Sequence, residues 1–421
     1  MKLKLLMLAV VCTAAAYAQE TYRFDFTGKA RKGYVRVDAT MLYDDAVGYG
    51  FDFGQIPSAD GRSPFFFSVK VPDGNYKVTV KLGSETSAGE TTVRGESRRL
   101  FVEREKTEAG KFKKETFIVN KRNTRITDDV RVRIKPREKK KLNWDDKLTL
   151  EFNGPAPRVA EVVIEPTQKP ITVFLCGNST VVDQDNEPWG SWGQMIPRFF
   201  TDKVCIANYA ESGESANTFL AARRFEKALT QMKAGDYVFV EFGHNDQKQK
   251  GKGKGPWTSF YDSLKQYIVK AREKGATIVF VTPTQRRSFG EDGKIHDTHG
   301  EYPAAMRKLA EEEGVPVIEL NEMTRTLYET LGVETSRRAF VQYPANTFPG
   351  QTEALEDNTH FNPYGAYQIA KCVLQGIKDK KLGLARYIKD FKGYDPAHPD
   401  DVNAFVWDLS PFTEIEKPDG N

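Results

Sequence analysis

The hydrophobic pattern of the chain changes character near residue 170. Between residues 21 and 166, short apolar runs recur with little helical periodicity, and a turn signal such as residues 72–75 separates them. Apolar and polar residues alternate in residues 76–82, which is typical of a strand with one buried face. Short strands at this spacing predict an all-β sandwich domain, which we expect to span residues 19–166.

From residue 171, apolar runs of strand length alternate with longer amphipathic stretches. The expected strands are residues 171–176, 204–207, 237–242, 276–281 and 315–320. The expected helices are residues 191–200, 216–232, 258–274 and 303–313. Such βαβα alternation predicts an α/β fold, in which helices cover both faces of a mostly parallel sheet.

The ends of this second domain also have sequence signals. Residues 166–170 are rich in proline and polar residues and read as a linker. Asn362 followed by Pro363 predicts the start of a last helix, because asparagine caps helices and proline suits their first position. We expect the α/β domain to span residues 171–385. The tail, residues 386–421, is expected to pack as irregular structure on one of the domains.

The first eighteen residues form a separate element. Two lysines precede the apolar run 5–12, and small residues, Ala16 and Ala18, stand at the −3 and −1 positions before Gln19. This pattern is typical of a secretory signal peptide and is too short for a membrane span. We therefore expect residues 1–18 to be cleaved off near Ala18 and the protein to be secreted or periplasmic, without a membrane span.

Charge and cysteine usage narrow the classes of partner. The formal net charge is +4, and loss of the two signal lysines leaves +2, so nothing indicates a nucleic-acid partner. Cys176, Cys205 and Cys372 lie in apolar runs and are expected as buried free thiols, with a Cys176–Cys205 bridge left open. The sequence has no pair of histidines with H-x-x-x-H spacing and no cysteine cluster, so nothing in it supports a metal site.

Four polar motifs lie at the ends of predicted strands or before the last helix. They are Gly177-Asn178-Ser179, the glycine Gly213, Gly243-His244-Asn245-Asp246, and Asp357-Asn358-Thr359-His360. The carboxyl ends of strands in an open α/β sheet meet at one edge, where ligands bind. A serine, amide donors and an Asp/His pair at that edge are the components of a serine esterase.

Each of these residue types suits one step of ester hydrolysis. Ser179 needs a base to remove its proton; His360 can supply one, and Asp357, carried by the same loop, can orient the imidazole. The backbone N–H groups of Ser179 and Gly213 and the amide of Asn245 can stabilise an oxyanion. Taken singly, the same residues also fit structural roles as turns and caps.

In this order, the four motifs resemble those of the SGNH (GDSL-like) hydrolase family over residues 171–380. The resemblance implies that Ser179 is the nucleophile, His360 the base and Asp357 its partner. It makes Ser179, Gly213 and Asn245 the oxyanion hole. Within this family the chain looks most like the rhamnogalacturonan acetylesterases, on residues 177–181, 189–193, 243–246 and 297–303.

The closer resemblance implies removal of O-acetyl groups from a pectic polysaccharide, without a cofactor. The partner is then an acetylated acidic polysaccharide or oligosaccharide. The sandwich resembles galactose-binding-like modules in strand pattern alone, so a carbohydrate-binding or accessory role is an expectation. Two alternatives remain: an SGNH esterase or lipase that acts on another acetylated glycan or a small ester, and a non-catalytic glycan-binding protein.

Five further residues are candidates for substrate binding. Arg286 and Arg287 follow the fourth strand and suit the carboxylates of galacturonate, although a solvated loop is the alternative. Trp189 and Trp192 follow the nucleophile and suit stacking on sugars, although core packing is the alternative. His299 belongs to one of the strings that carry the closer resemblance.

A basic segment, residues 121–141, carries ten lysines and arginines against three acidic residues. Such a face can bind a polyanion through electrostatic attraction. A solvated hairpin is the interpretation that we favour.

Overall fold

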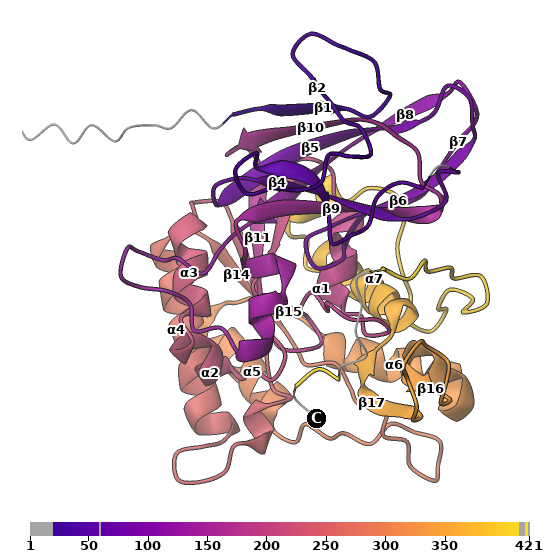
Figure 1. Ribbon diagram of the computed structural model, residues 1–421. Coiled ribbons are helices and arrows are strands. Elements are labelled where there is room, and N and C mark those ends of the chain that lie inside the picture. Colours follow the sequence, from indigo (N-terminus) through magenta and orange to yellow (C-terminus); the bar gives the residue numbers. More distant parts are fainter. Residues whose placement is uncertain (1–19, 59, 412–416, 420–421) are drawn as a thin grey trace, which may run out of the picture.

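The computed structural model describes residues 20–58, 60–411 and 417–419. The expected signal peptide, residues 1–18, lies outside these ranges. Two packed antiparallel sheets form the upper part of the molecule in Figure 1, and an α/β module forms the lower part. No helix in the described ranges is both long and apolar enough to cross a membrane.

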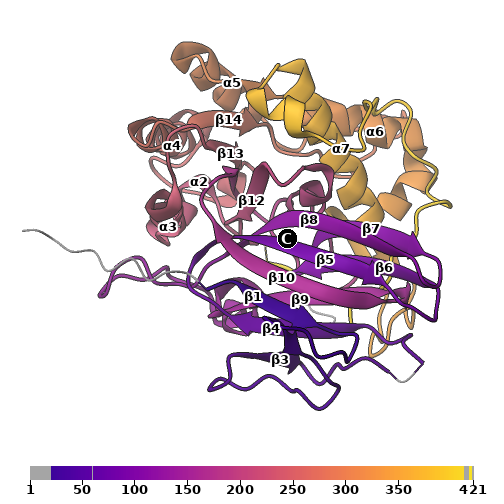
Figure 2. The same cartoon turned by 90° about the horizontal axis from the view of Figure 1, so that it is seen from above.

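Ten strands form the N-terminal sandwich, and neighbouring strands are antiparallel except for the pair β1 and β2 (Figure 2). One sheet has the order β2(Val35–Arg36), β1(Tyr22–Asp25), β10(Val159–Thr167), β5(Gly74–Gly83), β8(Phe112–Lys121). The other has the order β3(Tyr49–Asp52), β4(Phe65–Lys70), β9(Lys147–Ala156), β6(Gly89–Gly95), β7(Arg99–Thr107). The β-rich first region is as predicted; its likeness to galactose-binding modules stays a prediction.

Strand β5 illustrates why this sequence forms a sandwich. Tyr76, Val78, Val80 and Leu82 are buried, whereas the residues between them are partly exposed. Successive side chains of a strand point to opposite faces, so this alternation directs every second residue into the core between the sheets. The core also contains Phe67 and other aromatic residues of the facing sheet.

The α/β module is built on a parallel sheet buried on both faces. Its strand order is β12(Val204–Asn208), β11(Ile171–Gly177), β13(Tyr237–Glu241), β14(Thr277–Val281), β15(Val317–Ile318). One face packs on α1(Trp192–Met195), α6(Leu320–Thr335) and α7(Pro363–Asp379). The other packs on α2(Ala216–Ala221), α3(Arg224–Gln231), α4(Tyr261–Glu273) and α5(Tyr302–Glu313). The predicted three-layer α/β architecture is confirmed.

Helix α7 begins as the sequence indicated. The Asn362 side chain accepts a hydrogen bond from the Gly365 N–H at 3.0 Å, and Pro363 is the first helical residue. The helix buries one long face, including Ile369 and Val373, against the central sheet. It thereby fixes the position of the residues just before it, among them His360.

Several elements differ from the expectation. The expected helix 216–232 is two helices, because Arg223 adopts a left-handed conformation with φ of 63° between them. The expected strand 315–320 is shortened to β15, and α6, which was not predicted, begins at Leu320. Strands β16(Phe340–Tyr343) and β17(Leu355–Phe361) also escaped prediction. Asp357 and His360 therefore lie on a strand, not on the expected loop.

The basic segment is a solvated hairpin only around residues 124–132, where Arg125 and Arg131 form an antiparallel bridge and residues 127–129 are exposed. Its first two residues, Lys121 and Arg122, are buried, and Arg137 and Lys141 form ion pairs with Glu211 of the α/β module. The segment passes from the sandwich onto the α/β module, as its purple ribbon in Figure 1 shows. Acidic residues of the second module, which the charge count alone did not reveal, account for its position.

Cys176, Cys205 and Cys372 are buried free thiols, as expected. The C-terminal region after 3-10 helix η7(Gly383–Tyr387) is irregular up to residue 411. It contacts both modules: Asp408 pairs with Arg104 of the sandwich, and Asp400 pairs with Lys371 of α7.

Candidate active site

Three predicted site residues form a continuous hydrogen-bonded chain. His360 Nε2 lies 2.8 Å from Ser179 Oγ, and His360 Nδ1 lies 2.8 Å from Asp357 Oδ2. The three residues are only 3 %, 1 % and 4 % exposed, in the order Ser179, His360, Asp357. A hydroxyl within hydrogen-bond reach of an imidazole, itself oriented by a third group, is the arrangement of an activated nucleophile.

The Asp357 carboxylate is held at both oxygens. Oδ1 accepts the backbone N–H groups of Thr359 at 2.8 Å and His360 at 2.9 Å, which leaves Oδ2 for the imidazole. Burial raises the pKa of this carboxyl group, but the hydrogen bonds and the positive charge that His360 can carry lower the pKa by a larger amount. The net pKa lies well below its usual range, so Asp357 remains charged and can stabilise an imidazolium.

The turn that presents Ser179 is tight. A Cβ on Gly177 would lie 2.6 Å from the Val181 side chain, so only glycine fits where β11 ends. The Asn178 side-chain oxygen accepts the Thr180 N–H at 3.0 Å and lies 2.8 Å from Thr180 Oγ1. These contacts fix the backbone on both sides of Ser179, so its hydroxyl is aimed before substrate arrives.

The two other oxyanion candidates lie beside this turn. Gly213 has a φ of 78° in the loop after β12, and the same loop is joined to the turn by the Glu211 N–H, which donates to Gly177 O at 3.1 Å. Asn245 Nδ2 donates to Glu214 O at 2.9 Å. The four motifs therefore converge at one edge of the sheet. The roles of Gly213 and Asn245 as donors to an oxyanion remain a prediction.

A buried acid, Glu241, lies under the nucleophile turn and was not singled out from the sequence. It lies 2.8 Å from Thr180 Oγ1 and accepts the Trp192 indole N–H at 2.6 Å. Burial raises its pKa to about 7, although these hydrogen bonds and one from the Thr284 N–H act in the opposite direction. The sequence did contain a signal for this site: Glu241 is a charged residue at the end of the otherwise apolar strand β13.

Trp189 and Trp192 do not stack on a substrate in this structure. Both are 1 % exposed, and Trp192 donates its indole N–H to Glu241. The core-packing alternative is therefore correct, and the substrate-binding expectation is wrong. Trp192 supports the nucleophile turn from beneath.

His299 is likewise buried, to the same degree as His360, and its contact with substrate stays a prediction. Its Nε2 lies 2.8 Å from Thr284 O, and its ring packs edge-to-face on His244 with centroids 4.6 Å apart. Burial and the nearby positive charge of Arg286 lower the pKa of His299 to about 4. Burial is also the main cause of the low pKa of His244. Both rings are neutral at pH 7.

The two arginines that were expected to meet galacturonate are engaged by the protein. Arg286 donates to Thr298 Oγ1 at 2.9 Å and to His244 O at 3.3 Å. The Arg287 N–H donates to Asn358 O at 2.8 Å, and its guanidinium donates to Asn358 Oδ1 at 3.1 Å. Arg287 thus holds the segment between Asp357 and His360, and substrate binding by either arginine stays a prediction.

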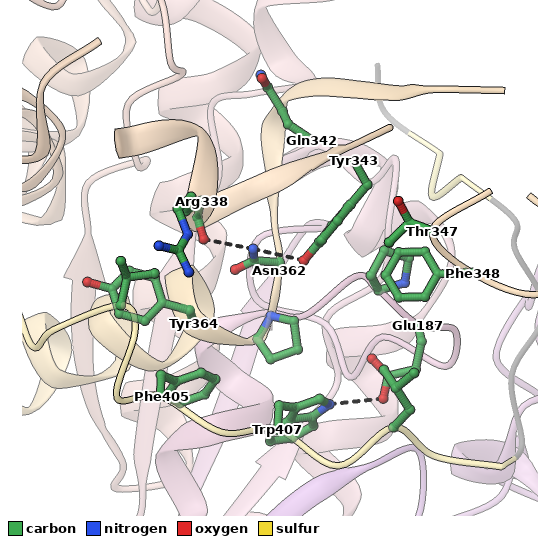
Figure 3. Close-up of a pocket in the computed structure, with 14 residues that line it drawn as sticks. Glu187, Arg338, Gln342, Tyr343, Thr347, Phe348, Asn362, Tyr364, Phe405 and Trp407 are labelled. Atoms are coloured by element: carbon green, nitrogen blue, oxygen red, sulfur yellow. Dashed lines mark hydrogen bonds between the residues drawn. The ribbon is translucent and has the colours of Figure 1, made fainter. Parts of the chain in front are cut away.

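A cavity of about 490 Å³ opens next to the strand that carries His360 (Figure 3). Asn362, two residues after His360, lies in its wall and donates to Arg338 O at 2.8 Å and to Tyr343 Oη at 3.0 Å. Aromatic rings dominate the lining: Tyr343, Phe348, Tyr364, Phe405 and Trp407. Sequence reasoning missed this cavity, because β16, the loop after it and the C-terminal region, which supply much of its lining, were not predicted in detail.

The arrangement at this sheet edge defines a serine hydrolase with a three-layer α/β module. Residues 175–367 match the GDSL-like Lipase/Acylhydrolase family, and the chain is 43% identical to a relative of which it covers 97%. The chain belongs to this family and is a serine carboxylic-ester hydrolase. The non-catalytic alternative is thereby excluded.

Three curated proteins of Bacillus subtilis (strain 168) illustrate the likeness. The rhamnogalacturonan acetylesterase RhgT is 43% identical over 228 residues, which are 54% of this chain and 97% of RhgT. The probable rhamnogalacturonan acetylesterase YesY is 33% identical over 219 residues, 51% of this chain and 96% of YesY. The uncharacterized esterase YxiM is 25% identical over 392 residues, 87% of this chain and 93% of YxiM.

A crystal structure of YxiM is among the similar solved structures. It has a TM-score of 0.47 and 23% sequence identity, and the match covers 87% of this chain and 100% of the YxiM chain.

Proposed function

We propose that the protein is a carbohydrate esterase that removes O-acetyl groups from rhamnogalacturonan. The observation that carries the proposal is the hydrogen-bonded chain from Ser179 through His360 to Asp357, in a sequence 43% identical to a rhamnogalacturonan acetylesterase. The expected signal peptide supports action outside the cytoplasm, in the periplasm or after secretion.

The reaction proceeds through an acyl-enzyme. His360 Nε2 takes the Ser179 proton as Oγ forms a bond to the acetyl carbonyl carbon. The tetrahedral intermediate collapses, the sugar oxygen leaves with the proton from His360, and the acetyl group stays on Ser179. Water then attacks the ester, again with His360 as base, and acetate and free Ser179 are released.

The negative charge that forms on the carbonyl oxygen is stabilised by fixed donors. The Ser179 N–H, the Gly213 N–H and the Asn245 amide surround the position of that oxygen. Donors that are aimed before reaction need no reorganisation, and each contributes about 3 kcal/mol to lowering the barrier. The Asn245 amide has two N–H groups, so its bond to Glu214 O leaves one for the substrate.

A polymeric substrate needs binding surface beyond the acetyl group. The aromatic cavity beside Asn362 supports this proposal, because aromatic faces pack well on sugar rings and several of its rings are partly exposed (Figure 3). We assign it to a sugar of the polymer at some distance from the one that carries the acetyl group. In this proposal the rings of the cavity take the role of stacking on sugar that was first expected of Trp189 and Trp192.

A side-by-side comparison of substrates tests the proposal. Acetate release is measured from acetylated rhamnogalacturonan, acetylated xylan and a short aryl acetate. The proposal expects the highest kcat/KM on rhamnogalacturonan. A higher value on xylan would transfer the activity to another acetylated glycan, and activity on the aryl acetate alone would indicate a small-ester hydrolase.

A further inference from the structure

Two cations of the basic segment lie directly over the loop that contains Gly213. Lys135 and Arg137 both donate hydrogen bonds to Ser212 O, the carbonyl that precedes Gly213. A Cβ built on Gly213 would lie 2.9 Å from Lys135 Nζ. The sandwich thus sends two positive charges to the edge of the proposed acetyl-binding site, along the purple segment seen in Figure 1.

Buried acids hold the two cations from beneath. Arg137 pairs with Glu211, and Lys135 Nζ lies 3.5 Å from Glu214 Oε1. The acidic side chains are 2 % and 5 % exposed, whereas Arg137 and Lys135 are 19 % and 28 % exposed. Because the acids lie on the buried side, an anion that approaches from solvent meets the cations first.

One donor of this pair has no hydrogen-bond partner. Arg137 Nε is buried and donates to no acceptor in the part of the chain that the structure describes. A carboxylate oxygen, Asp419 Oδ2, lies 3.4 Å from this atom and 3.5 Å from Lys135 Nζ. The two cations therefore already face a carboxylate, at a distance that a better-placed one would shorten.

Asp419 reaches this position from the far end of the chain. Its side chain is 53 % exposed, and its Cβ lies 2.9 Å from a Cβ built on Gly213. Exposed ion pairs are weak, so the contact can be displaced by a ligand that binds at more than one point. A carboxylate lying against Gly213 occupies space that substrate needs.

We propose that Lys135 and Arg137 form a subsite for the carboxylate of a uronate residue in the substrate, and that Asp419 is an internal competitor for it. The inference rests on the proposed function, since it assumes an acetylated acidic glycan at Ser179. It assigns the sandwich a part in substrate binding through the basic segment. It also places the cationic contact at the β12 edge of the site, away from Arg286 and Arg287.

The first test removes the competitor's charge. Asp419→Asn is compared with the control Asp129→Asn, which changes an exposed aspartate of the basic segment. The full-length protein hydrolyses a neutral aryl acetate, and digalacturonate is added as inhibitor with neutral digalactose as control. We expect Asp419→Asn to strengthen inhibition by digalacturonate about two- to fivefold, the range for an exposed ion pair. It should lower KM for acetylated rhamnogalacturonan oligosaccharides by a similar factor.

The second test removes a cation in the Asp419→Asn background. Lys135→Met should weaken digalacturonate inhibition and reduce, but not abolish, its dependence on salt between about 0.05 and 0.3 M, since Arg137 keeps its charge and screening acts on charge pairs. Lys135→Arg should restore both. The control is Lys139→Met, at an exposed lysine of 3-10 helix η1(Pro136–Lys140) without an ion pair to any described residue.

The outcomes separate this inference from the proposed function. The subsite is overturned if digalacturonate and digalactose inhibit equally, or if Asp419→Asn behaves like Asp129→Asn. Either result counts against it even when the wild type releases acetate from rhamnogalacturonan. The proposed substrate is overturned if the wild type cleaves the aryl acetate and is inhibited by digalacturonate but leaves rhamnogalacturonan acetylated. In that case the anion subsite is retained.

Discussion

Arg99 Nε lies 2.7 Å from Asp183 Oδ2, and both side chains are 0 % exposed. Arg99 begins strand β7 of the sandwich, whereas Asp183 lies four residues after the proposed nucleophile. Asp183 Oδ1 also accepts the Asn208 side-chain amide at 2.8 Å, at the end of β12. This ion pair therefore joins the sandwich to two of the loops that build the active site, and the two modules should unfold together.

Breaking this ion pair should be costly. Asp183→Ala leaves the Arg99 guanidinium buried without its counter-charge, so we expect a loss of about 3–5 kcal/mol in the free energy of unfolding. Urea unfolding, followed by far-UV circular dichroism, measures it. In the control Glu313→Ala, which removes a partner of the half-exposed Arg272, the loss should stay below about 1 kcal/mol.

A double variant, Arg99→Met with Asp183→Leu, shows whether the loss comes from the unpaired charge. Replacing both partners with apolar residues removes the desolvation cost along with the attraction. We expect it to be more stable than Asp183→Ala. If the two variants are equally unstable, packing and not charge accounts for the effect.

Ser179→Ala should abolish acetate release and leave the fold intact. The substitution removes one oxygen from a nearly buried side chain, and the hydrogen-bonded pair of His360 and Asp357 remains. Activity on the aryl acetate and a thermal unfolding curve are measured on the same preparation. Turnover like that of the wild type, in a folded variant, would contradict the acyl-enzyme mechanism.

Asn245→Ala removes one proposed oxyanion donor without altering the nucleophile. Because the amide contacts the oxygen mainly in the transition state, kcat should fall about 10²–10³-fold with little change in KM. The variant also loses the hydrogen bond to Glu214 O, so its stability is measured in parallel. An unchanged kcat would assign Asn245 to the structural role of joining two loops.

The alternation of apolar and amphipathic stretches was sufficient to predict the parallel sheet, and the four motifs in their order were sufficient to predict the convergence of Ser179, Asp357 and His360. The strand ends of such a sheet meet at one edge, which accounts for Ser179, whereas Asp357 and His360 reach that edge from β17, outside the parallel sheet. Burial was harder to predict. Trp192 is buried because Glu241 accepts its indole N–H, a contact between residues 49 positions apart that local patterns do not encode. The position of the basic segment depends in the same way on Glu211, a distant acid.

Arg287→Ala distinguishes positioning of the catalytic strand from binding of galacturonate. The variant keeps the backbone hydrogen bond to Asn358 O but loses the guanidinium bond to Asn358 Oδ1, which should loosen the placement of Asp357 and His360. We expect kcat to fall by similar factors on acetylated rhamnogalacturonan and on a neutral aryl acetate. Arg287→Lys should recover little, because a lysine cannot reproduce the planar set of donors. A loss confined to the acidic substrate, and seen in KM, would restore the original expectation.

The buried Glu241 should make the stability of the protein depend on pH. Burial raises the pKa of its carboxyl group from 4.5 to about 7, so the folded protein binds this proton more tightly than the unfolded chain does. Between these pH values the folded state holds more protons, and its stability falls as pH rises. The contribution of Glu241 amounts to roughly 3 kcal/mol and is lost by the time pH has passed through 7.

Glu241→Gln isolates this contribution. Asp246, whose pKa burial also raises to about 7, adds a slope of the same sign to both proteins, so only the difference between the two stability curves reports on Glu241. The glutamine keeps one oxygen acceptor but presents an NH₂ group to the other donor, either Thr180 or Trp192, which lowers stability by an amount that does not depend on pH. We therefore expect the variant to be clearly less stable than the wild type at pH 5 and to close most of that gap by pH 8. Parallel curves over this range would mean that Glu241 is already ionised at pH 5, and that its hydrogen bonds outweigh the cost of burial.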